Sequence, residues 1–72
     1  MTDKIKKQIL AVRETGLTNM FNINGVMFIA YQNNFYELVA YLSVKENRKE
    51  YSHFIITGEV EIDNRKEDGG NG

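Results

Sequence analysis

The sequence predicts an all-α protein, a compact bundle of three to four short helices with a disordered acidic C-terminal tail. Two observations favour this fold class: apolar residues recur at helical spacing in successive segments, and residues that cap helices stand at the segment ends. A third is size, since 72 residues without cysteine allow one domain and no disulfide. We therefore assign residues 1–59 to a single small helical domain and residues 60–72 to a flexible tail.

The first helix is expected over residues 3–15, with Thr2 as its N-cap and Gly16 where a C-cap belongs. Its apolar residues follow one amphipathic stripe: Ile5, Ile9, Leu10 and Val12. Residues 17–21 should form a connector, because Thr and Asn compete for local backbone hydrogen bonds. Three apolar residues of this connector are expected to be buried: Leu17, Met20 and Phe21.

A helix–turn–helix pair is expected next, over residues 23–33 and 35–42. Asn22 is placed to cap the first of these helices and Asn34 the second. Gly25 weakens a helix by about 1 kcal/mol relative to alanine, so its presence indicates close packing at the first turn.

The last ordered element is expected to be a helix over residues 45–57, because Tyr51, Phe54 and Ile55 recur at helical spacing and Gly58 can end it. The alternative is a short β-hairpin over residues 54–62, where β-branched residues cluster. After residue 62 the chain has no apolar residue and three glycines, a composition that cannot offset the entropy of ordering.

Groups suited to catalysis are sparse in this chain. His53 is the single histidine, and we interpret it as a partly buried or surface residue with a structural hydrogen bond. The two serines stand in no nucleophile context, and no helix follows the terminal glycines. We therefore expect no enzymatic activity, no metal site, no cofactor and no small-molecule substrate. No apolar run approaches the roughly 20 residues of a membrane span, so we expect a cytoplasmic protein without membrane contact.

Charge is distributed unevenly, although the formal net charge is only -1. No charged residue occurs from Thr15 to Tyr36, so this stretch should lie in the core or at an interface. Before the tail, the basic residues lie in the first helix and at Lys45, Arg48 and Lys49. The segment from Asn34 to Val44 carries one charged residue, an acidic one, which argues against insertion into a DNA groove.

Aromatic residues are the most informative feature, because all eight fall within residues 21–54. Tyrosines spaced by five cannot share one helical stripe, so one or two of them should be exposed. They either cover the rim of a small core or form an interface, where Tyr and Met are enriched. We predict five partner-binding residues: Met27, Phe28, Tyr31, Tyr36 and Tyr41.

Seven short runs within residues 2–59 form a pattern: Thr18-Asn19-Met20-Phe21, Asn24-Gly25-Val26, Ile29-Ala30, Tyr36-Glu37-Leu38-Val39, Asn47-Arg48-Lys49-Glu50-Tyr51, Phe54-Ile55 and Thr57-Gly58-Glu59. A chain with these runs resembles a family of very short uncharacterised proteins, a domain of unknown function, encoded in Gram-positive bacteria and their phages. The resemblance implies no catalytic or binding role for any residue. It implies a context in which small proteins often block a host protein, including nucleases of bacterial defence systems.

The sequence thus favours a non-enzymatic protein–protein interaction module. In its sharpest form it is a phage or prophage protein that inhibits a host defence protein such as a CRISPR nuclease, acting in the host cytoplasm. One alternative is a small helix–turn–helix DNA-associated regulator. Another is a homo-oligomeric structural accessory protein, since so small a domain buries little of its surface alone.

Overall fold

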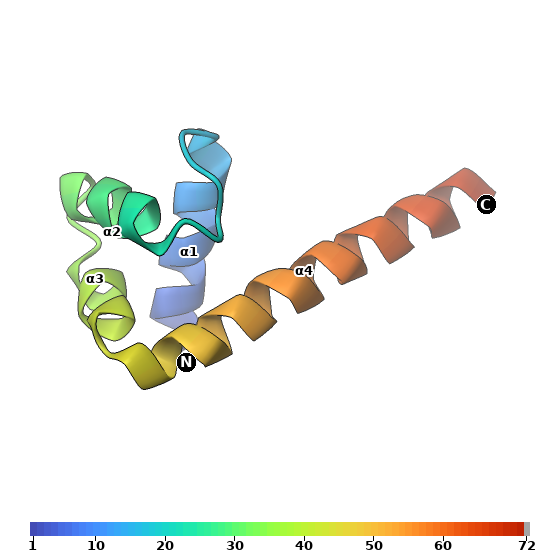
Figure 1. The fold of residues 1–72 in the computed structure, drawn as a ribbon. Helices are drawn as coiled ribbons and strands as arrows, with labels where there is room; N and C mark the ends of the chain where they lie inside the picture. Colours follow the sequence, from blue (N-terminus) through green and yellow to red (C-terminus); the bar gives the residue numbers. More distant parts are fainter. Residues whose placement is uncertain (72) are drawn as a thin grey trace.

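The computed structural model describes the backbone of residues 1–71 and the side chains of residues 1–58. The described chain forms four helices and no strand (Figure 1), which confirms the all-α fold class. The hairpin alternative for residues 54–62 is wrong, because they lie inside the last helix. The helices are α1 (Asp3–Thr15), α2 (Ile23–Gln32), α3 (Tyr36–Ser43) and α4 (Lys45–Asn71).

The short helix α3 holds the bundle together. It packs against each of the other three helices, and α1 also packs against α2 (Figure 1). The hydrophobic core contains residues from every helix and from the connector: Ile9, Val12, Met20, Val26, Ile29, Ala30, Leu38, Leu42, Tyr51 and Ile55.

Helix α1 has the bounds and the caps that the sequence predicts. The Thr2 hydroxyl accepts a hydrogen bond from the Ile5 N–H at 3.2 Å, which satisfies one free donor of the first turn. Gly16 ends the helix with φ +64°, a left-handed conformation that favours glycine. Local chemistry alone therefore determines where α1 begins and ends.

The connector buries only one of the three residues expected to be buried. Met20 is buried, but Leu17 is 74% exposed and Phe21 is 47% exposed. The reason is a tight turn in which the side chain of Asn19 accepts from the Phe21 N–H at 2.8 Å. The buried hydroxyl of Tyr51 donates to the Met20 carbonyl at 2.5 Å and ties this turn to α4.

Helix α2 starts as predicted, because the Asn22 side chain accepts from the Gly25 N–H at 3.1 Å. The expectation of close packing at Gly25 is also confirmed. A Cβ atom at this position would lie 2.4 Å from the Thr18 hydroxyl oxygen and 2.9 Å from the Asn22 amide nitrogen. Only glycine therefore fits the first turn of α2 without displacing its neighbours.

The prediction that Asn34 caps α3 is wrong. Asn34 adopts φ +64°, and α3 begins at Tyr36 with Phe35 as an N-cap that provides no side-chain hydrogen bond. Gln8 of α1 supplies the missing acceptor, since its amide oxygen accepts from the Leu38 N–H at 3.0 Å. An isolated helix as short as α3 is marginal in water, so capping from a neighbouring helix stabilises it.

The other end of α3 is held by two side chains of α4. The Asn47 amide donates to the Tyr41 carbonyl at 3.0 Å, and the Arg48 Nε donates to the Leu42 carbonyl at 2.9 Å. These bonds satisfy carbonyl groups that the end of a helix leaves free. Arg48 is thus committed to a structural contact.

Helix α4 contributes Tyr51 and Ile55 to the core and continues to Asn71, running away from the other helices (Figure 1). It does not end at Gly58, where the sequence predicts a C-cap. Gly58 has a negative φ, not the left-handed conformation of a C-cap glycine, and the helix continues through it. The predicted flexible tail over residues 60–72 lies outside the residues whose side chains are described, so it stays a prediction. Within the described chain, no helix combines the length and apolarity that crossing a bilayer requires.

Candidate functional site

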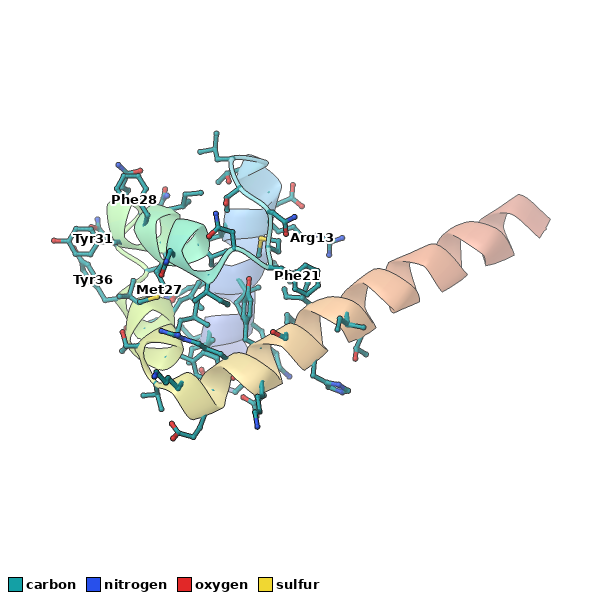
Figure 2. All side chains as sticks on the ribbon, viewed as in Figure 1. Arg13, Phe21, Met27, Phe28, Tyr31 and Tyr36 are labelled. Carbon is teal, nitrogen blue, oxygen red and sulfur yellow. The ribbon has the colours of Figure 1, made fainter. Side chains whose placement is uncertain are left out.

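Four of the five predicted partner-binding residues come together on one side of the bundle. Helix α2 turns Val26, Ile29 and Ala30 into the core, so the residues between them point outward. Tyr36, the first residue of α3, lies beside them (Figure 2). We call this group the aromatic surface and define it by four residues: Met27, Phe28, Tyr31 and Tyr36.

The aromatic surface is exposed far beyond what folding requires. Phe28 is 61% exposed, Tyr31 is 62% exposed and Tyr36 is 54% exposed, whereas Met27 is half-buried against the core. The rings of Tyr31 and Tyr36 stand edge to face, with centroids 5.8 Å apart and planes inclined by 68°. This pair links α2 to α3 across the solvent-facing side of their junction (Figure 2).

The polar residues between Tyr31 and Tyr36 are neutral. The Tyr36 hydroxyl donates to the Asn34 side-chain oxygen at 2.8 Å. Gln32 and Asn33 are exposed at the end of α2, and the sequence places no charge between Thr15 and Tyr36. The uncharged segment was expected either in the core or at an interface. In the structure its inner residues form core and its outer residues form the aromatic surface.

The first charged residue after Tyr36 is paired with a charge of opposite sign. Glu37 forms an ion pair with Lys4 of α1 at 3.3 Å. The pKa of Glu37 falls from 4.5 to about 2, because the Gln8 amide, the backbone at Glu37 and the Lys4 ammonium all donate hydrogen bonds to its carboxylate. The start of α3, and with it Tyr36, is therefore held against α1 by a network of hydrogen bonds and charge.

Gln8 is the residue of this network that the sequence analysis missed. It is buried, its amide nitrogen donates to Glu37 at 2.8 Å, and its oxygen accepts from Leu38. Its position offered a signal, since it lies three residues after Ile5 and four before Val12, on the apolar stripe of α1. A polar residue on such a stripe must find hydrogen-bond partners inside the fold.

Tyr41 does not belong with the other predicted residues. It packs against the core, and its hydroxyl donates to the Glu50 carboxylate on α4. Burial, and then this hydrogen bond, raise the pKa of Tyr41. Five residues advance a helix by about 140°, so Tyr41 faces α4 while Tyr36 faces solvent.

Further exposed apolar residues lie away from the aromatic surface. Figure 2 shows Phe21 and Arg13 on the opposite side, toward α4. Leu17, at 74%, is more exposed than any ring of the aromatic surface but stands in the connector between α1 and α2. Leu17 therefore serves as a matched control for the experiments below.

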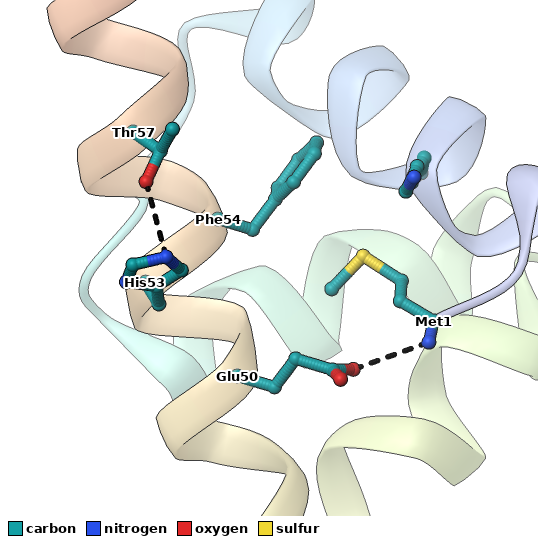
Figure 3. A pocket seen from close by; sticks show the side chains of 6 residues that line it. Met1, Glu50, His53, Phe54 and Thr57 are labelled. Carbon is teal, nitrogen blue, oxygen red and sulfur yellow. Dashed lines mark hydrogen bonds and ion pairs between the residues drawn. The ribbon is translucent and has the colours of Figure 1, made fainter.

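A shallow depression of about 290 Å³ lies between the N-terminus and α4 (Figure 3). The terminal amine pairs with Glu50 at 3.3 Å, and the exposed His53 ring lies 3.5 Å from the Thr57 hydroxyl. Among the residues that the structure describes, no three His, Cys, Asp or Glu side chains are grouped to hold a metal ion. The depression is lined by Met1, Lys6, Glu50, His53, Phe54 and Thr57.

Comparison with known proteins places the chain in a family. Residues 1–59 match the family described as a domain of unknown function (DUF5049), so the chain belongs to this family. This confirms the resemblance to an uncharacterised family over the predicted helical domain. No curated protein and no solved structure matches the chain.

Proposed function

We propose that this protein is a non-enzymatic protein-binding module that acts through the aromatic surface. The observation that carries the proposal is the exposure of three aromatic rings, each more than half accessible, on an uncharged part of the molecule. Protein interfaces are enriched in Tyr, Phe and Met and depleted of charge at their centre. Contiguous exposed apolar patches on small proteins mark interaction sites.

A DNA-associated regulator has weaker support as the alternative. The second helix of such a motif must bring cations to phosphates, but α3 carries one charged side chain, Glu37. Arg48 donates its Nε to a carbonyl of α3. Lys4 of α1 forms an ion pair with Glu37.

In its narrower form the proposal is that a phage or prophage of a Gram-positive host encodes this protein. It would then act in the host cytoplasm by binding and inhibiting a host defence protein such as a CRISPR nuclease. Its support is the sequence resemblance, and the aromatic surface offers a contact for such an inhibitor.

The test compares capture of host proteins by the wild type and by two variants. The wild type should retain one host protein stoichiometrically, and the double variant Tyr31→Ala, Tyr36→Ala should lose it while keeping its helical circular dichroism. Leu17→Ala, which shortens an exposed side chain outside the aromatic surface, should retain it. Titration calorimetry with the purified host protein then measures the affinity of each variant. Capture that survives the double substitution would show that another surface binds.

A further inference from the structure

We infer that the aromatic surface binds a second copy of this chain, in a two-fold symmetric dimer. The inference rests on the proposed function, because both require that this surface binds protein. It names one partner, and it implies that a foreign partner and the second copy compete for the same rings.

The chemistry of the aromatic surface is compatible with itself. A two-fold contact places the same residues of both copies against each other, so a charge near the axis would meet its own like charge. The segment that carries these rings, Thr15 to Tyr36, contains no charged residue. The exposed hydroxyl of Tyr31 and the amide of Gln32 both donate and accept hydrogen bonds, so each can pair with its own copy.

The surrounding charges do not oppose such a contact either. Glu37, which follows Tyr36, is paired with Lys4 within the same copy. Two copies that meet through the aromatic surface therefore bring together two neutral pairs. A nucleic-acid strand that stacks its bases on these rings would instead need cations beside them, and the nearest ion pair offers none in excess.

The exposed rings supply a substantial part of the area that a small dimer needs. Buried aromatic side chains contribute about 150–250 Å² each, so three rings that are 54–62% exposed offer roughly 270–440 Å² per copy. A standard interface takes about 600–1,000 Å² from each partner. The rings thus supply a little under half of it. Met27 adds apolar area beside them, and the exposed amides of Gln32 and Asn33 are of the polar kind that a rim usually has.

Self-association would also add to the limited apolar burial of so small a domain. Ten buried apolar residues form the core among the described side chains, and domains of this size bury a smaller share of their surface than larger ones. A dimer buries the rings that the monomer leaves in water, and the gain adds to the stability of both copies.

The experiment measures the molar mass of the full chain by light scattering and sedimentation equilibrium between about 1 μM and 1 mM. One chain has a mass of 8.3 kDa, so the dimer has twice that mass. Tyr31→Glu and Tyr31→Lys should each weaken self-association at least about 100-fold, because like charges would face each other across the axis. Mixing the two variants should restore a species of dimer mass. Leu17→Glu should leave the dimer intact, and circular dichroism checks that each variant is folded.

Each outcome decides the inference. A wild type that stays at 8.3 kDa overturns it, while the proposed function still stands or falls on host-protein capture. A dimer that survives both Tyr31 substitutions, or that mixing fails to restore, shows that the contact is elsewhere. If the Tyr31 variants do not fold, isotope-filtered NMR on mixed labelled and unlabelled wild type should show intermolecular contacts at Phe28 and Tyr31. Their absence from a dimer overturns the inference equally.

Discussion

Removing the hydroxyl of Tyr51 tests how the connector is held to α4. The Tyr51 ring is fully buried, and its hydroxyl donates to the Met20 carbonyl at 2.5 Å, across 31 positions of the sequence. Tyr51→Phe keeps the ring and leaves the buried carbonyl without its donor. The connector would then lose its hydrogen bond to α4.

The expected loss follows from this geometry. A buried acceptor without a partner costs about 1–3 kcal/mol, and packing of the ring is unchanged. For a domain of this size each 1 kcal/mol lowers Tm by about 4–8 °C, so Tm should fall by at least about 4 °C. Thermal and urea denaturation followed by circular dichroism measure the loss of stability. The urea m-value should not change, because unfolding exposes nearly the same surface area in the variant and in the wild type.

Tyr36→Phe is the matched control, because it removes a hydroxyl from an exposed ring that bonds only to Asn34 at the surface. Its free energy of unfolding should change by less than about 0.5 kcal/mol. A Tyr51→Phe variant that loses no more than this control would refute the proposed role of the hydroxyl.

Alkaline pH provides a second readout of the burial of the Tyr51 hydroxyl. Burial raises the pKa of Tyr51 to about 12, above its ordinary value of 10. The stabilisation by the neutral phenol is therefore complete below pH 10 and is lost as the pH rises from 10 to about 12. Tyr51→Phe should lack this part of the alkaline loss of stability.

The remaining predictions concern other contacts of the bundle. Gly25→Ala should destabilise the protein, because the added Cβ would lie 2.4 Å from the Thr18 hydroxyl oxygen. Gly58→Ala should stabilise it by about 0.5–1 kcal/mol, because a Cβ at this helical position would meet no atom within 4 Å. Urea denaturation of both variants measures the change in the free energy of unfolding. Changes of the same sign in the two variants would contradict the close packing at the start of α2. Gln8→Leu should lower the free energy of unfolding by about 1–3 kcal/mol, because it leaves the buried Leu38 N–H at the start of α3 without an acceptor. Amide hydrogen exchange should then become faster in α3 than in α2. Equal acceleration in both helices would argue against the capping role of Gln8. Glu37, whose pKa is lowered from 4.5 to about 2, should contribute stability that is present above pH 4.5 and lost as the pH falls toward 2. Glu37→Gln should reduce the loss of stability between pH 4.5 and 2, measured by denaturation at a series of pH values. An unchanged loss would mean that other carboxylates cause it.

The sequence predicts those elements whose ends depend on local contacts. Thr2 and Asn22 accept from N–H groups three residues away, so the starts of α1 and α2 can be read from a few neighbouring letters. The start of α3 cannot, because its acceptor is Gln8, which lies 30 positions from the Leu38 donor. The same local rule that succeeds at Asn22 fails at Asn34, where a left-handed backbone leaves no capping geometry.

The five predicted partner-binding residues separate for a comparable reason. Helical spacing alone shows that the tyrosines cannot share a stripe, but it does not show which of them faces solvent. Contact with α4 decides this, because the Glu50 carboxylate takes the hydroxyl of Tyr41 and leaves Tyr36 to pair with Tyr31. The packing of α3 between α1 and α4 is thus what assembles the aromatic surface.

Folding alone does not explain the composition of that surface. Helix α2 needs one apolar stripe to face the core, and Val26, Ile29 and Ala30 provide it. Its outer face could carry charged residues at no cost to the core, as the outer face of α1 does with its lysines. Instead it carries Phe28 and Tyr31, more than half exposed. The exposed part of each ring adds little to the stability of the monomer, and this is the reasoning behind the proposed binding role.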